Sequence, residues 1–423
     1  MKEDRNRRHW RGQGQSCWRT LAAIGAASAV SVTGWATIAG ARSAHSTLRA
    51  ANKPIVLGVV AAEGTSYDNN NDRIAAVKAA MDAINKTGGI NGRKLQMVYC
   101  NGEHTPNDEL ACAKTMISDH VTALIGSEIG NPSAIGLYNA SGIPDIDTEA
   151  YTTPTFTTRD SFLSTGGASY QVAGVTAEGK SYGCKKLFFI GDTFYTPIAQ
   201  LVAKKVGLQW VGASSPSETT TNFDPVAAQV ASSHANCVEI IEAPQTSIAI
   251  GNALAAAGVH TPLLFNGDVP DPKELDTITG ASSTTFLVSA DTPPPSATFI
   301  PGIKEMDAQL AAYYKATGTI YATYPNMRMS AVRVWLDVQM FAEIAKGLKK
   351  VDASTIRQAY LTVKNVTGLG MIPNWTPAKK GCLKDYTDVS NPYEWYLKLK
   401  NGEYVLIRGQ AEKPVDLNQY LCS

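Results

Sequence analysis

The stretch that decides the fold runs Ala80-Met81-Asp82-Ala83-Ile84-Asn85-Lys86-Thr87-Gly88-Gly89-Ile90-Asn91-Gly92-Arg93-Lys94-Leu95. Its first part completes a pattern in which apolar residues from Ile74 to Ile84 recur at helical spacing. Gly88-Gly89 supplies the positive φ that ends a helix, and Asn91-Gly92 favours a tight turn. The sequence therefore predicts a helix that stops at the double glycine and turns directly into a strand.

Strand and helix patterns alternate on both sides of this stretch. Residues 54–62 form a continuous apolar, Val-rich run, which is typical of a strand buried on both faces. Residues 94–100 alternate between apolar and polar and predict a second strand. Further strands are expected at residues 121–126 and 143–146, and helices at residues 110–118 and 134–141. Repeated alternation of this kind predicts a parallel α/β sheet.

A second series of α/β patterns follows further along the chain. It predicts strands at residues 186–191, 208–211, 237–241, 262–265 and 285–289, with helices at residues 197–206, 225–233 and 247–257. Thr292-Pro293-Pro294-Pro295 fits neither a helix nor a central strand and marks a linker. Two long helices, at residues 303–315 and 327–347, precede a hairpin centred on Asn401-Gly402. We expect two α/β lobes of similar size.

Composition and charge limit the function classes. The chain has 423 residues, 44% of them hydrophobic and 18% charged, enough for two or three packed domains. With 38 Lys and Arg against 37 Asp and Glu, it lacks the basic field that nucleic-acid binding needs. We therefore expect no nucleic-acid partner.

The first 44 residues predict an export signal. They contain seven basic residues against two acidic ones, followed by an apolar run from residue 21 to residue 38 that Gly, Ser and Thr dilute. Small-residue cleavage sites place the predicted cut near Ala41 or Ala44. An uncleaved anchor remains an alternative, and Arg7-Arg8 leaves twin-arginine export open beside the general route. We expect the protein on the periplasmic or cell-surface side of the membrane.

The cysteine count supports export. Outside the leader the chain has an even number of cysteines, which favours disulfides and allows 15 connectivities. Cys184 and Cys237 precede strands that can be parallel neighbours, Cys100 and Cys112 flank a short loop, and Cys382 and Cys422 remain. We expect these three pairs, with buried reduced thiols as the alternative. No C-x-x-C motif or Cys/His cluster is present, so we expect neither a metal nor a cofactor.

The run from Ala80 to Leu95 resembles the type I periplasmic solute-binding proteins of ABC importers, in the branched-chain amino acid branch. The similarity extends over about residues 54–375 and includes residues 105–112, 185–195 and 256–266. It implies two Rossmann-like lobes with a ligand cleft at the hinge, and three crossovers, near Phe162, near Pro293 and at residues 371–377. Lobe one is then residues 52–162 plus 293–372, and lobe two is residues 163–292 plus 373–423.

The resemblance implies two ligand loops in lobe one. In the Gly126–Ser133 loop, relatives hold a ligand carboxylate with hydroxyl and amide groups, which points to Ser127 and Ser133. For Ser133 the alternative is an ordinary helix N-cap. Glu128 departs from the family pattern, because a carboxylate there favours a donor-rich or cationic ligand end. In the Glu149–Pro154 loop, Ala150 and Thr152 take the contact positions.

Further ligand contacts are implied in the first loop and in lobe two. Tyr195 matches the cleft tyrosine of the family, and Tyr67 lies where relatives often bring an aromatic ring, with half-buried rim residues as the alternative. Asp268 is a candidate for the acid that meets a ligand ammonium; the alternative is a turn residue capping the next segment. The arginine expected before the first crossover is absent, and residues 242–245 lack an aromatic. Together these departures weaken the assignment to a leucine-like ligand, and the other ligands of this family branch (amides, urea-like solutes and aromatic acids) stay open.

Motifs for catalysis are missing. The first strand is followed by Ala61-Ala62-Glu63-Gly64-Thr65, which is neither a Walker loop, a G-x-G-x-x-G motif nor a nucleophile elbow. A repressor or receptor ectodomain of this fold would add a DNA-binding or membrane-anchored segment, which we do not expect. The sequence therefore predicts a monomeric, non-enzymatic protein that captures a small polar solute (an amino acid, amide or similar) and delivers it to an ABC permease. A sensory binding protein that presents its liganded form to a membrane receptor is the alternative.

Overall fold

The computed structural model describes residues 53–422 except 66–68, 148, 150–152, 159, 218 and 269. The predicted export signal at residues 1–44 lies outside the described residues, as do three predicted ligand contacts, Tyr67, Ala150 and Thr152. Within the part of the chain that the structure describes, no helix combines the length and apolar character needed to cross a membrane.

The first sheet contains five parallel strands in the order β2-β1-β3-β4-β5. They are β1 (Ile55–Ala61), β2 (Leu95–Asn101), β3 (Ala123–Ile125), β4 (Asp145–Ile146) and β5 (Ser161–Phe162). The first four match the predicted strands. Between β1 and β2, the backbone has positive φ at Gly88, Gly89, Asn91 and Gly92, as the quoted stretch requires. A Cβ on Gly89 would lie 2.0 Å from the carbonyl oxygen of Arg93, so this turn demands glycine.

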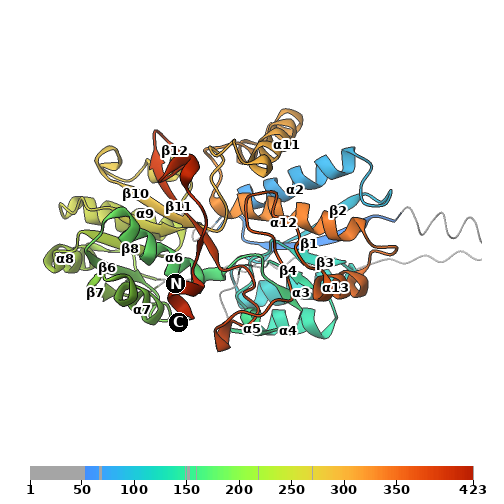
Figure 1. The fold of residues 1–423 in the computed structure, drawn as a ribbon, viewed down its shortest axis with the longest axis horizontal. Helices are drawn as coiled ribbons and strands as arrows, with labels where there is room; N and C mark the ends of the chain where they lie inside the picture. Colours follow the sequence, from blue (N-terminus) through green and yellow to red (C-terminus); the bar gives the residue numbers. More distant parts are fainter. Residues whose placement is uncertain are drawn as a thin grey trace, which may run out of the picture. The chain divides into compact units, whose positions relative to one another are not determined.

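Helices cover both faces of the first sheet because β1 is apolar on both. Leu57 and Val59 pack with α2 (Asn71–Lys86) and α12 (Met329–Lys346). Val56 and Val60 face the other way, toward α3 (Pro106–Ser118) and α4 (Pro132–Ala140). In Figure 1, α2 (blue) and α12 (orange) lie side by side although they are far apart in sequence, and α11 (Pro301–Thr317) also packs on α2.

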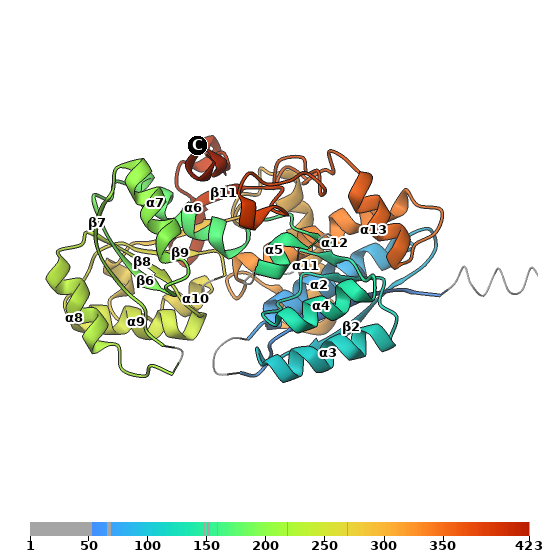
Figure 2. The ribbon, with the colours of Figure 1, turned by 90° about the horizontal axis from the view of Figure 1, so that it is seen from below.

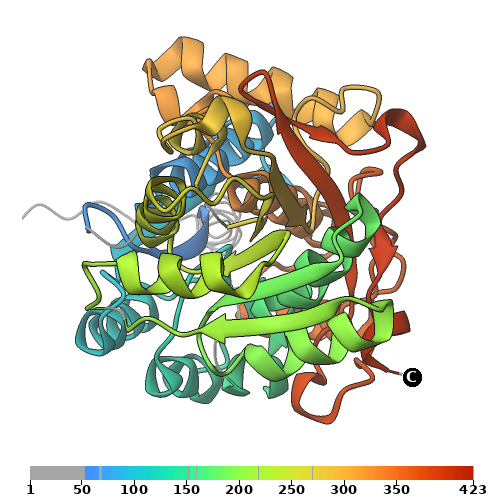
Figure 3. The same cartoon turned by 90° about the vertical axis from the view of Figure 1, so that its left-hand side faces the viewer.

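The second sheet is mixed. Its strand order is β12-β11-β10-β9-β8-β6-β7, and β13 pairs with β11. The strands are β6 (Lys186–Gly191), β7 (Gln209–Ser214), β8 (Cys237–Ile241), β9 (Leu263–Asn266), β10 (Phe286–Ala290), β11 (Tyr393–Lys400), β12 (Glu403–Leu406) and β13 (Val415–Asp416). β6 to β10 pair in parallel, whereas β11 is antiparallel to β10. The predicted hairpin at Asn401-Gly402 forms the red edge visible in Figure 3.

Two helices pack on each face of the second sheet. α6 (Gly167–Tyr182) and α7 (Thr196–Val206) lie on one side of β6 and β8, and α8 (Asp224–Ser233) and α9 (Pro244–Ala256) lie on the other (Figure 2). The sequence analysis did not predict α6. Its residues 167–179 are all buried and many are small, so it has no polar face and no amphipathic period to detect.

The chain passes between the two sheets three times. It goes from β5 to α6, from β10 to α11, and from α13 (Ala353–Thr362) to β11. Ser390 Oγ, in the third passage, donates to the carbonyl of Leu163 in the first at 3.1 Å, and Ser164 Oγ of the first passage donates to Asp337 of α12 at 2.9 Å. The remaining short helices are α5 (Thr153–Thr157), α10 (Pro272–Leu275) and α14 (Asn418–Leu421). This architecture confirms the predicted fold class, two α/β lobes with mainly parallel sheets.

Three disulfides join the same pairs of cysteines as the sequence analysis expects. Cα–Cα separations are 5.6 Å for Cys100–Cys112, 5.9 Å for Cys184–Cys237 and 5.8 Å for Cys382–Cys422. The second pair follows from sheet order, because β6 and β8 are parallel neighbours with Leu187 opposite Cys237. This disulfide therefore links the starts of two core strands of the second lobe.

Candidate functional site

A cleft of about 770 Å³ lies where the carboxyl ends of strands from both sheets meet. From the first sheet it is reached by residues that follow β2, β3 and β4; from the second, by residues that follow β6, β8 and β9. The described residues that line it are Arg73, Glu103, His104, Pro106, Glu109, Glu128, Gly130, Asn131, Pro132, Glu149, Ala168, Asp192, Tyr195, Pro216, Thr219, Ile241, Glu242, Ala243, Pro244, Asn266, Asp268 and Arg328.

Two of the predicted ligand contacts, Tyr195 and Asp268, line this cleft. They come from the second lobe, Tyr195 at the start of α7 and Asp268 just after β9. Asp268 does not cap the next helix, because Asp271 forms the capping box of α10. Asp268 therefore lies in a turn, as the alternative interpretation expects, but does not cap α10.

Ser127 and Ser133 are not among the lining residues. Ser127 is fully buried, and its Oγ accepts a hydrogen bond from the amide of Val60 at 3.0 Å. Ser133 is exposed, and its amide donates to Asn131 Oδ1 at 2.9 Å. Asn131 is thus the N-cap of α4, which corrects the alternative interpretation of Ser133 as the cap.

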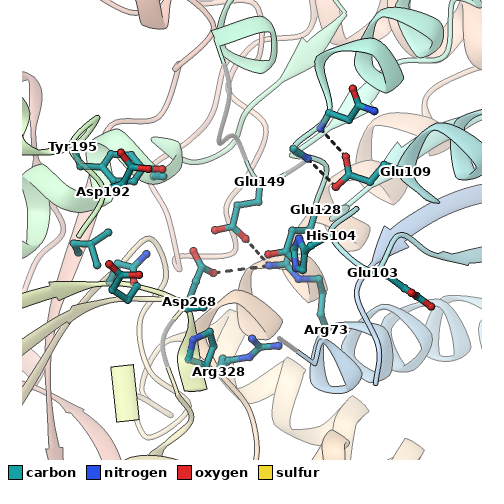
Figure 4. A pocket seen from close by; sticks show the side chains of 18 of the residues that line it. Arg73, Glu103, His104, Glu109, Glu128, Glu149, Asp192, Tyr195, Asp268 and Arg328 are labelled. Atoms are coloured by element: carbon teal, nitrogen blue, oxygen red, sulfur yellow. Dashed lines mark hydrogen bonds and ion pairs between the residues drawn. The ribbon is translucent and has the colours of Figure 1, made fainter. Parts of the chain in front are cut away.

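The start of α4, where a ligand carboxylate was expected, is filled by the protein's own acid. Glu109 of α3 accepts the amide of Gly130 at 3.1 Å and the amide of Asn131 at 2.6 Å (Figure 4). Burial raises the pKa of Glu109, and these two hydrogen bonds act in the opposite direction. These two amides, which would otherwise suit an anion, are therefore already bonded.

Glu128 also lines the cleft, on the wall that the first lobe forms. Its Oε2 accepts a hydrogen bond from Asn70 Nδ2 at 2.5 Å and lies 3.3 Å from His104 Nε2. His104 and the preceding Glu103 both have positive φ, a conformation that non-glycine residues rarely adopt. This part of the wall presents a carboxylate and an imidazole to the cleft.

Arg73, Glu149 and Asp268 form the floor of the cleft (Figure 4). Arg73 Nη2 lies 2.5 Å from Glu149 Oε2 and 3.9 Å from Asp268 Oδ1, and Nη1 donates to the carbonyl of Gly126 at 3.3 Å. Gly126 has positive φ and no room for a side chain, since a Cβ would lie 2.6 Å from Val334. The guanidinium therefore connects groups that follow β3, β4 and β9.

Arg333 extends this network behind the floor. It projects from α12 and is almost fully buried. Its nitrogens lie 3.2 Å from Asp147, 3.1 Å from Glu149 and 2.9 Å from Asp291. Because Asp147 and Glu149 follow β4 and Asp291 follows β10, one side chain holds acids from both lobes.

The two floor carboxyls have opposite protonation tendencies. Burial acts to raise the pKa of Glu149, but Arg333, the hydrogen bond with Asp268 and Arg73 together hold it below its ordinary range. Burial and the adjacent negative charge of Glu149 raise the pKa of Asp268 well above its ordinary value, against the opposing effect of the two arginines.

Acidic side chains dominate the described cleft lining. Arg73 is paired with Glu149, and Arg328 is paired with Asp72 through contacts of 2.8 and 3.1 Å. Seven acidic residues line the cleft against these two arginines and one histidine. They are Glu103, Glu109, Glu128, Glu149, Asp192, Glu242 and Asp268. The cleft is therefore suited to a ligand group that donates hydrogen bonds and carries positive charge.

Sequence reasoning missed three members of this site, Arg73, Glu149 and Arg333. A signal existed for Arg333, which lies next to the inward-facing Val334 and Trp335 on an otherwise apolar helix. Such a charged residue on a buried stripe requires a buried partner. Glu149 has no local signal beyond its place at the start of a loop, because its role depends on Arg333, 184 positions away.

The comparisons with known proteins agree with this architecture. The profile described as periplasmic binding protein matches residues 54–385, so the chain belongs to the periplasmic binding protein family. The family resemblance predicted from the run at residues 80–95 is thus confirmed. No curated protein sequence matches the chain significantly.

Solved structures with the same fold are distant in sequence. A branched-chain amino acid ABC transporter protein from Thermus thermophilus with bound valine has a TM-score of 0.70 and 14% identity, covering 88% of this chain and 99% of its own. The branched-chain amino acid binding protein of Streptococcus pneumoniae in complex with isoleucine has a TM-score of 0.67 and 16% identity (86% and 99%). A fatty acid ABC transporter substrate-binding protein from Thermomonospora curvata has a TM-score of 0.69 and 18% identity, covering 87% of this chain and 94% of its own.

Proposed function

We propose that this protein is an exported solute-binding protein that captures a small polar solute with a cationic nitrogen and delivers it to an ABC permease. A solute-binding role follows from its family and fold. The charge class of the solute is our inference from the cleft.

The observation that carries the charge class is the excess of carboxyls in the described cleft lining. A ligand carboxylate would need free donors, yet the amides of Gly130 and Asn131 are bonded to Glu109. The guanidinium of Arg73 is bonded to Glu149. An ammonium group, by contrast, would find acceptors on both lobes, including Glu128 and Asp268.

Two of the solved structures support a small solute that carries an amine. They are described with bound valine or isoleucine, which carry an α-ammonium group on a small body. In this chain the sequence departures at residues 161–164 and 242–245 argue against a leucine-like ligand. Amines, basic amino acids and amino-acid amides fit the acidic cleft better.

Ligand contacts from both lobes would drive closure. A solute that bonds Glu128 on the first lobe and Asp268 and Tyr195 on the second would be held best when the lobes approach. Because it would bind the closed state more tightly, it would shift the population toward that state. A permease that recognises the closed state would then receive only loaded protein.

A thermal-shift screen with matched compounds tests the charge class. Each amino acid is compared with the amine that lacks its carboxylate, the acid that lacks its amine, and its amide. A ligand at 100 times its Kd adds about 2.7 kcal/mol of stability, a clear upward shift in Tm. We expect shifts only with compounds that retain the amine; a deaminated acid that shifts Tm as strongly would contradict the proposal.

Uptake measurements test delivery. Cells lacking the gene should lose high-affinity uptake of the solute found in the screen, and a plasmid copy should restore it. If uptake stays normal while a cellular response to the solute disappears, the protein is a sensor rather than the binding component of an importer.

A further inference from the structure

Two buried carboxyl oxygens at the floor of the cleft have no hydrogen-bond donor among the described residues: Glu149 Oε1 and Asp268 Oδ1. The Glu149 side chain is 1% exposed and the Asp268 side chain is 15% exposed. Glu149 Oε2 takes the hydrogen bonds from Arg73 at 2.5 Å and Arg333 at 3.1 Å. Asp268 Oδ2 accepts Gln171 Nε2 at 3.0 Å. Each carboxyl thus has one oxygen that accepts hydrogen bonds and one oxygen that accepts none from the described residues.

The two carboxyls lie side by side (Figure 4), because Glu149 Oε2 and Asp268 Oδ1 lie 2.5 and 3.9 Å from the same nitrogen, Arg73 Nη2. Two adjacent carboxylates in a buried site repel each other strongly when both are ionised, which favours one proton held by the pair. Burial together with the neighbouring Glu149 raises the pKa of Asp268 well above its ordinary value. A proton on Asp268 therefore persists well above the ordinary pH range for a carboxyl.

Charged groups from several packed elements act on this proton, in both directions. Arg73 of α2 and Arg333 of α12 each lie 3.9 Å from Asp268 Oδ1. Burial and the charge of Glu149 oppose the two arginines, and Asp291 after β10 and Glu394 of β11 belong to the same buried network. The guanidiniums are bonded to Glu149 and Asp291 at 3.1 Å or less, so Asp268 is the carboxyl left to be neutralised.

We infer that the Glu149–Asp268 pair holds one shared proton in the empty cleft and exchanges it for the cationic nitrogen of the solute. This inference rests on the proposed function, because it needs a solute with such a nitrogen. The ammonium N–H groups would donate to Glu149 Oε1 and Asp268 Oδ1. The displaced proton passes to water. The solute nitrogen brings one positive charge and the lost proton removes one, so the net charge of the site does not change.

The exchange would connect the lobes. Glu149 follows β4 of the first sheet and Asp268 follows β9 of the second, so either a proton or an ammonium group bridges the two. Binding then releases up to one proton per solute. Affinity rises with pH by about tenfold per unit while the pair still holds its proton, and levels off above that pH.

The ligand-free test is a potentiometric titration of wild type and Asp268→Asn. The asparagine keeps the shape and offers an amide donor toward Glu149 Oε1, so it mimics the protonated acid. We expect the variant to release one proton fewer than wild type above pH 5. The control Asp192→Asn changes an exposed cleft acid outside the pair and should retain that proton. Equal release by wild type and Asp268→Asn overturns the inference.

Calorimetry with L-lysine, L-leucine and 3-methylbutylamine, in buffers of different ionisation enthalpy, tests the exchange itself. We expect proton release with any amine that binds wild type, and none with Asp268→Asn. Binding without proton release at every pH would overturn the exchange while leaving the proposed function intact. If no amine binds, the proposed function fails, and the titration still decides whether the pair holds its proton.

Discussion

Two groups of buried carboxyls in this protein have the same burial and opposite surroundings. At the cleft floor, Glu149, Asp147 and Asp291 contact the guanidinium of Arg333. In the second lobe, three glutamates of α6, β8 and β11 are at least as buried but form no ion pair with any described arginine or lysine. They are Glu178, Glu239 and Glu394, which accept hydrogen bonds from the Leu397 amide, Thr176 and Ser289 respectively.

The contact of Glu149 with two arginines, rather than its burial, distinguishes it from the three glutamates. The pKa of Glu149 lies below its ordinary range because two arginines stabilise its carboxylate against the effect of burial. Burial raises the pKa of Glu239 to about 8, and it raises those of Glu178 and Glu394 well above their ordinary value. Glu149 therefore stays ionised at the cleft floor, while the second lobe keeps neutral acids in its core.

The largest effect should come from removing the cation. Arg333→Gln leaves Asp147, Glu149 and Asp291 without their shared partner, and breaking a buried ion pair costs about 3–5 kcal/mol. Urea unfolding measures the loss. Arg357→Gln is the matched control, since Arg357 pairs with Asp160 but is partly exposed, and its loss should cost about 1 kcal/mol or less. Equal losses in the two variants would show that the buried network contributes no more than a surface pair.

Replacing one acid in each group should change the free energy of unfolding at neutral pH in one group and not in the other. Glu149→Gln removes a charged acceptor from Arg73 and Arg333, at a cost of about 1.5–3 kcal/mol for hydrogen bonds to charged groups. Glu239→Gln replaces an acid that is already largely neutral at pH 7 and should not destabilise the protein. Unfolding free energies that fall equally in both variants would remove the distinction between the groups.

The pH dependence of stability sharpens the comparison further. Below its ordinary pKa of 4.5, Glu239 is protonated in both folded and unfolded chains; between 4.5 and about 8 only the folded chain holds the proton. Wild type should therefore lose about 1.4 kcal/mol per pH unit, relative to Glu239→Gln, as pH rises through this window. Thermal unfolding at several pH values measures the difference. Parallel profiles would mean that Glu239 is ionised in the folded protein.

The smallest effect concerns an uncharged contact in the cleft. Tyr195→Phe removes a hydroxyl that the second lobe brings to the lining, and should weaken solute binding by about 0.5–1.5 kcal/mol, or two- to tenfold in Kd. Ser133→Ala, at an exposed position outside the lining, should leave Kd unchanged. If Ser133→Ala weakens binding and Tyr195→Phe does not, the solute occupies a different surface.

Local patterns predicted most of the fold. The buried strands, the double-glycine turn and the Asn401-Gly402 hairpin depend on residues close in sequence, and the structure has all of them. α6 escaped prediction because burial on all sides removes its period. The site was less predictable: Glu109 occupies the amides of Gly130 and Asn131 across 21 and 22 positions, a contact that no local pattern encodes.

The most direct test of the central claim is a crystal structure with the solute that gives the largest thermal shift. We predict that its cationic nitrogen lies within about 3.2 Å of both Glu149 and Asp268, the range of an N–H···O hydrogen bond. A solute carboxylate at this position, with the nitrogen pointing out of the cleft, would contradict the account.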